Sequence, residues 1–243
     1  MWWNNLFENM SSTSFFNFSF LPAYTGYFLQ GMAYTLLLAV VSVALAVIPA
    51  LLLALMRLSK RKVIQCISGA YIAVFRSTPL LVQLSIIYFG LFTAISIPRI
   101  TILGFVDLSR FIPGVVALAL NSSAYVAEIF RAGILAVDKG QTEAARSLGL
   151  SSWQSMRLVV LPQAIKNVLP ALANEIVTMV KESSICSMLG MAELMFVSKT
   201  VATGTYITLA PYTIAALIYF CINYPASKAI EAIERRMRRG DKQ

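Results

Sequence analysis

The chain has 243 residues, of which 58% are hydrophobic and 13% are charged, and its formal net charge is +9. A soluble domain is typically about 25% charged, so this composition excludes an ordinary soluble fold. The chain contains no histidine and no GxxxxGK[ST] loop, which excludes histidine-based catalysis, histidine metal sites and a nucleotide-binding loop of its own. Cys66, Cys186 and Cys221 lack the CxxC spacing of zinc and redox sites, and we expect no metal site.

Residues 1–26 combine aromatic side chains with Asn and Ser and contain no Lys or Arg. Aromatic side chains are typical of membrane–water interfaces, so we expect an interfacial segment on the outer face. The missing positive start argues against a cleaved signal peptide. Tyr27–Met56 follows as 30 uncharged residues. At about 1.5 Å per residue, this helix is longer than the ~30 Å hydrocarbon core, and we predict a first transmembrane span.

The second and third spans are predicted from the next two apolar regions. Val63–Phe75 is too short to cross a membrane alone, so we expect it to lie near the inner interface or to extend the second span inward. Ser77–Ile97 is uncharged over 21 residues and is the predicted second span. The third span begins near Phe111 and stays uncharged to Ala127, with Glu128 at its inner end.

The segment 138–162 between the third and fourth spans predicts a helix, a break and a second helix. Gly149 supplies a sharp turn, and Ser151 with Gln154 has the spacing of a capping box. Pro162 suits the first turn of the next helix. The segment is either a solvated connector or a docking element. Its apolar residues favour docking, since a free loop would not expose them: Ala144, Ala145, Leu148, Leu150 and Trp153.

The fourth span, Pro162–Leu194, is unusual because it carries several charges. A charge at the bilayer centre costs about 2.5–3.5 kcal/mol, so these side chains must face other helices or line a path. Glu175 and Glu182 share one helical face with Met179, and Asn174, Thr178 and Lys181 share the adjoining face. The candidates for a substrate path are Asn174, Glu175, Thr178, Lys181, Glu182 and Glu128. A structural role is the alternative, in which Glu182 pairs with Lys181 or Arg76.

The fifth predicted span is Thr200–Ser227, which contains no charge. Fifteen of the 20 Lys and Arg residues fall in three clusters, at 57–62, 131–166 and 228–242. Cytoplasmic segments are rich in Lys and Arg, so the N-terminus is expected outside and the C-terminus inside. The sequence predicts an all-α integral membrane protein with five transmembrane helices. Its transmembrane domain covers 27–230, and a basic cytoplasmic tail covers 231–243. The positions of the positive charges indicate contact with the lipid bilayer rather than with nucleic acid.

Two motifs resemble a known family. Glu143-Ala144-Ala145, Gly149 and Val159–Pro162 resemble the cytoplasmic signature loop of ABC importer permeases, although that signature commonly has isoleucine at the position of Val159. Phe75–Leu84, FRSTPLLVQL, resembles a signature of the polar amino acid permeases of the histidine/glutamine/arginine/glutamate group, which often has glycine in place of Ser77.

The resemblance implies a transporter of several chains in the cytoplasmic (inner) membrane. Two permease subunits, identical or homologous, would form the pathway, and an extracytoplasmic binding protein would deliver the amino acid. Two cytoplasmic ATPase subunits would use ATP and Mg, so this chain needs no cofactor and has no catalytic residue. The residues implied in ATPase coupling are Glu143, Ala144, Ala145, Gly149, Leu161 and Pro162.

Two other functions were compared with this one. A self-sufficient, ion-coupled secondary carrier would use the intramembrane acids, but five spans leave no room for inverted repeats. An intramembrane enzyme would need a histidine base or paired aspartates, and the only aspartates are Asp107, Asp138 and Asp241. The sequence favours the permease and leaves the transported amino acid open.

Overall fold

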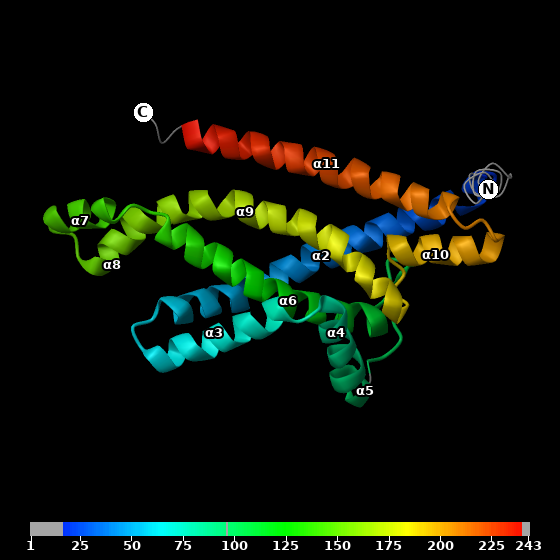
Figure 1. Cartoon of the computed structure of the whole chain (residues 1–243), viewed down its shortest axis with the longest axis horizontal. Coiled ribbons are helices and arrows are strands. Elements are labelled where there is room, and N and C mark those ends of the chain that lie inside the picture. The colour runs from blue at the N-terminus through cyan, green and yellow to red at the C-terminus, as the bar shows by residue number, and fades with distance from the viewer. Residues whose placement is uncertain (1–16, 96, 240–243) are drawn as a thin grey trace, which may run out of the picture.

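The computed structural model describes residues 17–95 and 97–239, and most of them form helices that run along one long axis (Figure 1). The helices in chain order are α2 (Leu21–Leu58), α3 (Lys62–Ser77), α4 (Leu80–Ser85), α5 (Phe92–Ala94), α6 (Leu108–Leu135), α7 (Lys139–Ser147), α8 (Ser152–Ser155), α9 (Leu161–Glu182), α10 (Leu194–Thr205) and α11 (Ala210–Arg239). Two π-helical turns, η1 (Ile86–Leu91) and η2 (Met156–Val160), and a 3₁₀ segment, η3 (Ser183–Leu189), connect some of them. The predicted aromatic segment lies largely outside the described residues.

The core forms where α2, α6 and α9 pack together. Tyr34 of α2 meets Phe111 of α6 edge to face, with ring centroids 5.6 Å apart. Leu38, Leu118 and Met179 are fully buried between the three helices. Close packing rather than hydrophobic burial joins helices in a membrane, and small residues permit it. This packing fixes α9, the helix that carries the predicted path residues, against α6.

Two of the described helices are long and apolar enough to cross a membrane by themselves, α2 and α6. They confirm the first and third predicted spans and extend beyond the predicted ends. Two bent helix pairs raise the number to four if each pair is one span: α3 with Leu80–Ala94, and Ser152–Leu189 with α10.

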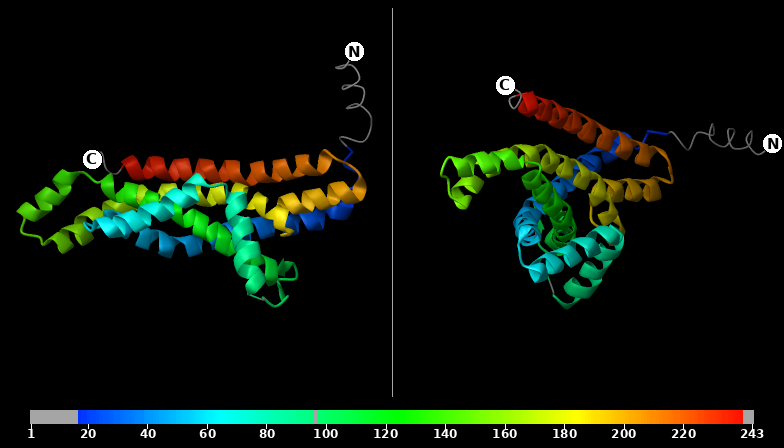
Figure 2. Two further views of the ribbon diagram at one scale, coloured as in Figure 1. Left: turned by 60° about the horizontal axis from the view of Figure 1, so that its bottom comes forward. Right: turned by 60° about the vertical axis from the view of Figure 1, so that its left-hand side comes forward.

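Of the two expectations for Val63–Phe75, the straight inward extension of the predicted second span, Ser77–Ile97, is wrong. Helix α3 ends at Ser77, and the segment Leu80–Ala94 leaves it at 106°. Thr78 has an extended backbone because the ring of Pro79 disfavours a helical residue before it. Helix α3 turns back along α2, where Ser68 Oγ donates a hydrogen bond to the Leu53 carbonyl at 2.8 Å. Figure 2 shows α4 and α5 projecting sideways from the long axis.

The predicted fifth span, Thr200–Ser227, is also wrong as one helix. Helix α10 ends at Thr205, Tyr206 is left-handed with φ 58°, and α11 begins at Ala210. Helix α11 then continues to Arg239, so the basic segment predicted as a separate tail begins inside the same helix. The turn is not visible in the sequence because the whole run lacks Asp, Glu, Lys and Arg.

A short β-hairpin interrupts the predicted all-α structure. Strand β1 (Thr101–Ile102) pairs antiparallel with β2 (Val106–Asp107), with Thr101 opposite Asp107. Leu103 and Gly104 both have positive φ, 55° and 76°, as the turn requires. Asp107 then caps α6 by accepting a hydrogen bond from the Ser109 backbone N–H at 2.9 Å.

Candidate functional site

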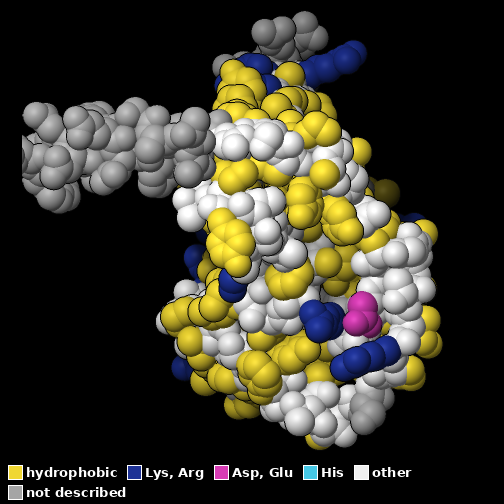
Figure 3. Space-filling model, turned by 90° about the vertical axis from the view of Figure 1, so that its right-hand side faces the viewer, with side chains coloured by type: hydrophobic (Ala, Val, Ile, Leu, Met, Phe, Trp, Pro, Cys, Tyr) yellow, Lys and Arg dark blue, Asp and Glu magenta, His cyan; other side chains and the backbone are white. Residues whose placement is uncertain are grey.

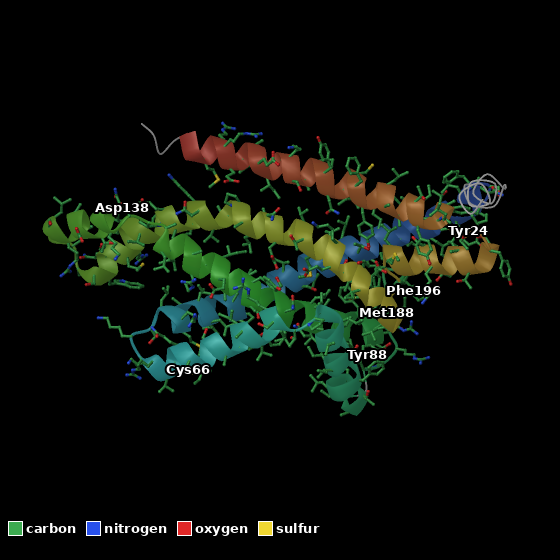
Figure 4. The ribbon with its side chains drawn as sticks, viewed as in Figure 1. Tyr24, Cys66, Tyr88, Asp138, Met188 and Phe196 are labelled. Carbon is green, nitrogen blue, oxygen red and sulfur yellow. The ribbon has the colours of Figure 1, made fainter. Side chains whose placement is uncertain are left out.

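Helices α7 and α8 form a hairpin that extends beyond the rest of the bundle (Figure 1). Asp138 caps α7, because its carboxylate accepts a hydrogen bond from the Gly140 backbone N–H at 2.6 Å. Figure 4 shows Asp138 at one end of the molecule, and Tyr24 and Phe196 at the opposite end. The hairpin therefore lies at the end where α6 finishes and α9 begins.

The turn of this hairpin has the predicted form. Gly149 has φ +87°, a conformation that side chains disfavour. Ser151 and Gln154 form the reciprocal capping box, with Gln154 Oε1 accepting from the Ser151 N–H at 2.8 Å. The Arg146 guanidinium donates to the Leu150 carbonyl at 2.9 Å across the turn. These bonds hold the two short helices together as a defined unit.

The hairpin displays apolar side chains outward. Leu148 is 84% exposed and Trp153 is 69% exposed, whereas Ala145 is buried against the hairpin's own interior. Ala144 and Glu143 are exposed, and the Glu143 carboxylate has no hydrogen bond or ion pair to any other described residue. A large exposed leucine and tryptophan beside a free carboxylate form a surface suited to a protein partner.

The second helix of the hairpin continues directly into α9. The Leu161 backbone N–H bonds to the Met156 carbonyl in a π-helical turn, and Pro162 occupies the first turn of α9 as predicted. Leu161 and Pro162 are exposed. Because α8, η2 and α9 form one helical path, a movement of the hairpin would be transmitted along α9.

Glu175 is the predicted path residue that lies most clearly inside the bundle. It is half-buried on α9, and its Oε1 accepts a hydrogen bond from Ser122 Oγ of α6 at 2.7 Å. Met179, predicted on the same face, is completely buried in the core. The face that carries Glu175 therefore points at α6 rather than at open space.

Asn174 points elsewhere, although it precedes Glu175. It lines a cavity of 480 Å³ between α9 and α11 together with Lys166, Glu231 and Glu234. Thr178 is half-buried. The structure thus separates Asn174 and Glu175 between two interfaces of α9.

The remaining charged candidates are distributed around α9 and α6. Lys181 is exposed and Glu182 is half-buried, and neither forms an ion pair within the described part of the chain. Among the described residues, no salt bridge joins Glu182 to Lys181 or to Arg76, the two partners of the structural alternative. Glu128 pairs with Arg131 on its own helix at 2.7 Å, away from Glu175.

Two buried polar groups were missed by the sequence analysis. Glu193 is fully buried, accepts from the Met195 and Phe196 backbone N–H groups, and receives a hydrogen bond from Tyr219 Oη at 3.0 Å. Asn121 Nδ2 donates to Gln83 Oε1 at 2.7 Å and so joins α6 to α4. The sequence contains a signal for each group. Glu193 is a carboxylate directly before an apolar segment, as expected of a helix cap, and Asn121 is a single amide within an apolar run.

The opposite end of the molecule carries few charges. Figure 3 views that end, where hydrophobic and uncharged side chains cover most of the face. A cavity of 390 Å³ opens there between Tyr24 of α2 and Phe196 of α10. The small number of charged side chains at this end agrees with the expectation that the three basic clusters belong to the hairpin end.

Comparison with protein families finds one match that covers most of the chain. The model described as "Binding-protein-dependent transport system inner membrane component" matches residues 42–239. The arginine transport system permease protein ArtQ of Bacillus subtilis (strain 168) is 41% identical over 215 residues, covering 88% of this chain and 94% of the relative. The putative glutamine transport system permease protein GlnP of Rickettsia typhi is 40% identical, covering 87% and 93%.

Solved structures match the same fold. An amino acid ABC transporter crystallised with histidines has a chain that is 47% identical, with a TM-score of 0.81, covering 90% of this chain and 98% of that chain. The inward-facing MetNI methionine ABC transporter contains a chain that is 18% identical with a TM-score of 0.65, covering 86% and 97%, and it shows a shared fold.

Proposed function

Because this chain belongs to the family of binding-protein-dependent transport system inner membrane components, we propose that it carries polar amino acids across the cytoplasmic membrane. It is the permease subunit of an amino acid ABC importer and a multi-pass membrane protein. The observation that carries this conclusion is the identity of 41% to ArtQ over 94% of that permease.

The proposed topology has five crossings, with the N-terminus outside and the C-terminus inside. Helices α2 and α6 supply the first and third crossings, and the bent segment from α3 to α5 supplies the second. Helix α9 with η3 supplies the fourth, and the apolar part of α11 supplies the fifth. The Lys and Arg clusters support this orientation, since positive segments stay in the cytoplasm.

The α7–α8 hairpin is the proposed coupling element. Leu148 and Trp153 would enter a cleft on a cytoplasmic ATPase subunit, and Glu143 would face a cation there. The continuous helical path from Ser152 to Glu182 supports this role, because it joins the docking surface to the helix that carries Glu175. The ATP and Mg would be bound by the ATPase alone.

Glu175 is the proposed contact for the substrate's ammonium group, or for a cationic side chain if the substrate is basic. Its position between α6 and α9 supports this role, because a half-buried carboxylate with one serine partner keeps free acceptor sites. A second permease subunit, identical or homologous, would complete the pathway, and an extracytoplasmic binding protein would deliver the amino acid.

The alternative function is a secondary carrier driven by an ion gradient. Uptake of radiolabelled glutamine or arginine by cells expressing the complete system distinguishes the two. Collapse of the proton gradient by a protonophore, with cellular ATP maintained, should leave uptake unchanged. Loss of uptake under that condition would support the carrier and contradict the proposal.

A further inference from the structure

A cleft of 420 Å³ lies near the end of α2, against α3 and α6, and belongs neither to the coupling hairpin nor to the Glu175 interface. Its lining includes Arg57 of α2, Gly69, Ala73 and Arg76 of α3, and Glu128 of α6. Gly69, Ala73 and Arg76 are spaced by four and three residues, so they form one face of α3. The small residues Gly69 and Ala73 therefore form the floor of the cleft between Arg57 and Arg76.

The glycine in this floor makes room for Arg57. A Cβ atom at residue 69 would lie 3.1 Å from Arg57 Nη1, so the guanidinium extends directly over the glycine. Arg76 lies two helical turns further along α3, about 10 Å away. Its guanidinium carbon lies 5.5 Å from the centre of the Tyr125 ring of α6.

Both arginines lack an anionic partner in the described part of the chain. Neither guanidinium group forms a hydrogen bond or an ion pair there. Glu128 does not neutralise them, because its Oε2 accepts hydrogen bonds from both Nε and Nη2 of Arg131, at 2.9 and 2.7 Å. The cleft therefore presents two uncompensated positive charges.

The surroundings of the cleft identify the kind of anion. Arg57 stands beside Lys60, Arg61 and Lys62, the cluster that marks the cytoplasmic side. Next to the cleft on α3, the uncharged residues Cys66, Ala70 and Ala73 are exposed, and Val74 beyond them is 58% exposed. Guanidinium groups bind phosphate oxygens through paired N–H donors, and exposed aliphatic side chains bind acyl chains. A phospholipid supplies both groups, whereas a soluble phosphate supplies only one.

We propose that the cleft between Arg57 and Arg76 binds the phosphate of a phospholipid from the cytoplasmic leaflet, with its acyl chains against the outer face of α3. Basic pockets between transmembrane helices on the cytoplasmic side bind anionic headgroups in this way. The lipid phosphate lies between the two guanidinium groups and supplies the negative charge that the cleft lacks. This site is independent of the substrate carried.

The test is native mass spectrometry of the purified transporter titrated with phosphatidylglycerol. We expect Arg57→Gln and Arg76→Gln each to weaken lipid binding about tenfold, as loss of a charge-assisted hydrogen bond predicts. Gly69→Leu keeps both charges but fills the floor, and should weaken binding to a similar extent. The matched control is Lys60→Gln, which removes one charge outside the cleft and should change binding by no more than about twofold.

Three results would overturn the proposal. If Lys60→Gln weakened the binding of phosphatidylglycerol as much as Arg57→Gln does, the lipid would be attracted by the positive charge of the whole region and not by a specific site. Binding of glycerol 3-phosphate as tight as that of phosphatidylglycerol, and lost in the arginine variants, would assign the cleft to a soluble phosphate. Dissociation of the second permease subunit in the Arg57→Gln/Arg76→Gln variant, with lipid retained, would assign the arginines to a protein interface.

Discussion

The carboxylate of Glu175 on α9 accepts a hydrogen bond from the hydroxyl of Ser122 on α6 at 2.7 Å. This bond joins the helix that continues from the α7–α8 hairpin to a central helix of the core. It also explains how a charged residue is accommodated in a helix predicted to cross the membrane. The carboxylate faces a neighbouring helix with a polar partner instead of facing lipid.

The first prediction concerns this carboxylate. Glu175→Gln keeps the size of the side chain and removes its charge, so it should lower amino acid uptake about tenfold or more, or change which amino acid is preferred. Uptake by reconstituted transporter, with ATP hydrolysis followed in parallel, measures the effect. Ser122→Ala is the control, because it removes the bond but retains the charge and should preserve the preference. If the Glu175→Gln variant transported the same amino acid at an unchanged rate, the face of α9 that carries Glu175 would have only a structural role.

The second prediction concerns topology. Single cysteines placed near Glu8 and Lys199 should react with an impermeant maleimide from outside, and those near Lys62, Gln141 and Gln243 only from inside. Cys66 and Cys221 are exposed, so both must first be replaced by serine. A label at Gln141 that reacts from outside would contradict the five-crossing arrangement.

The third prediction concerns the contact between α6 and α9. A Cβ at Gly133 would clash with Val168 Cγ2 and would lie 3.3 Å from the Ala164 carbonyl oxygen. Gly133→Ala should therefore reduce the free energy of unfolding by about 1–3 kcal/mol, since the branched valine is stiff. The midpoint of thermal unfolding in detergent reports the change, and Val168→Ala should restore much of it. Gly26→Ala, where no atom lies within 4 Å, is the matched control. Equal unfolding midpoints for Gly133→Ala and Gly26→Ala would show that the close approach of α6 and α9 at Gly133 does not contribute to stability.

The fourth prediction concerns the buried Glu193. Its replacement by alanine removes the cap of α10 and leaves the Tyr219 hydroxyl without its acceptor. We expect a loss of about 2 kcal/mol in stability. Tyr219→Phe should cost less, because the cap remains, and the double variant should lose less than the sum of the two. Strict additivity of the two effects would show that Glu193 and Tyr219 act independently.

Local chemistry explains which parts of the structure were predictable. Gly149, Ser151 and Gln154 form the predicted turn and capping box because their conformations depend on neighbouring residues alone. The first and third spans were recognisable from their hydropathy. The break at Pro79 was left open between an interfacial helix and an inward extension of the span, because an uncharged run does not show a change of direction. The turn at Tyr206 was missed for the same reason.

The candidate site was less predictable than the fold, because it depends on contacts between distant residues. Helical spacing placed Glu175 and Met179 on one face, which is right, but did not show that this face packs on Ser122 and the core. Asn174 is adjacent to Glu175 in sequence and lines a different cavity, because successive residues on a helix point about 100° apart. The pairing of Glu128 with Arg131 follows from their spacing of three residues and was available from sequence.

If the α7–α8 hairpin couples ATP hydrolysis to amino acid transport, two single variants, Gly149→Val and Glu143→Lys, test this coupling most directly. The first change strains a backbone with φ +87°, and the second reverses a charge on the docking surface, while the spans remain intact. The measurement is the ratio of amino acid molecules taken up to ATP molecules hydrolysed in proteoliposomes containing the complete transporter. We predict that each variant stays in the membrane and either loses the ATPase subunits or hydrolyses ATP with at least tenfold less uptake per ATP. A normal ratio with fully bound ATPase in both variants would contradict the account.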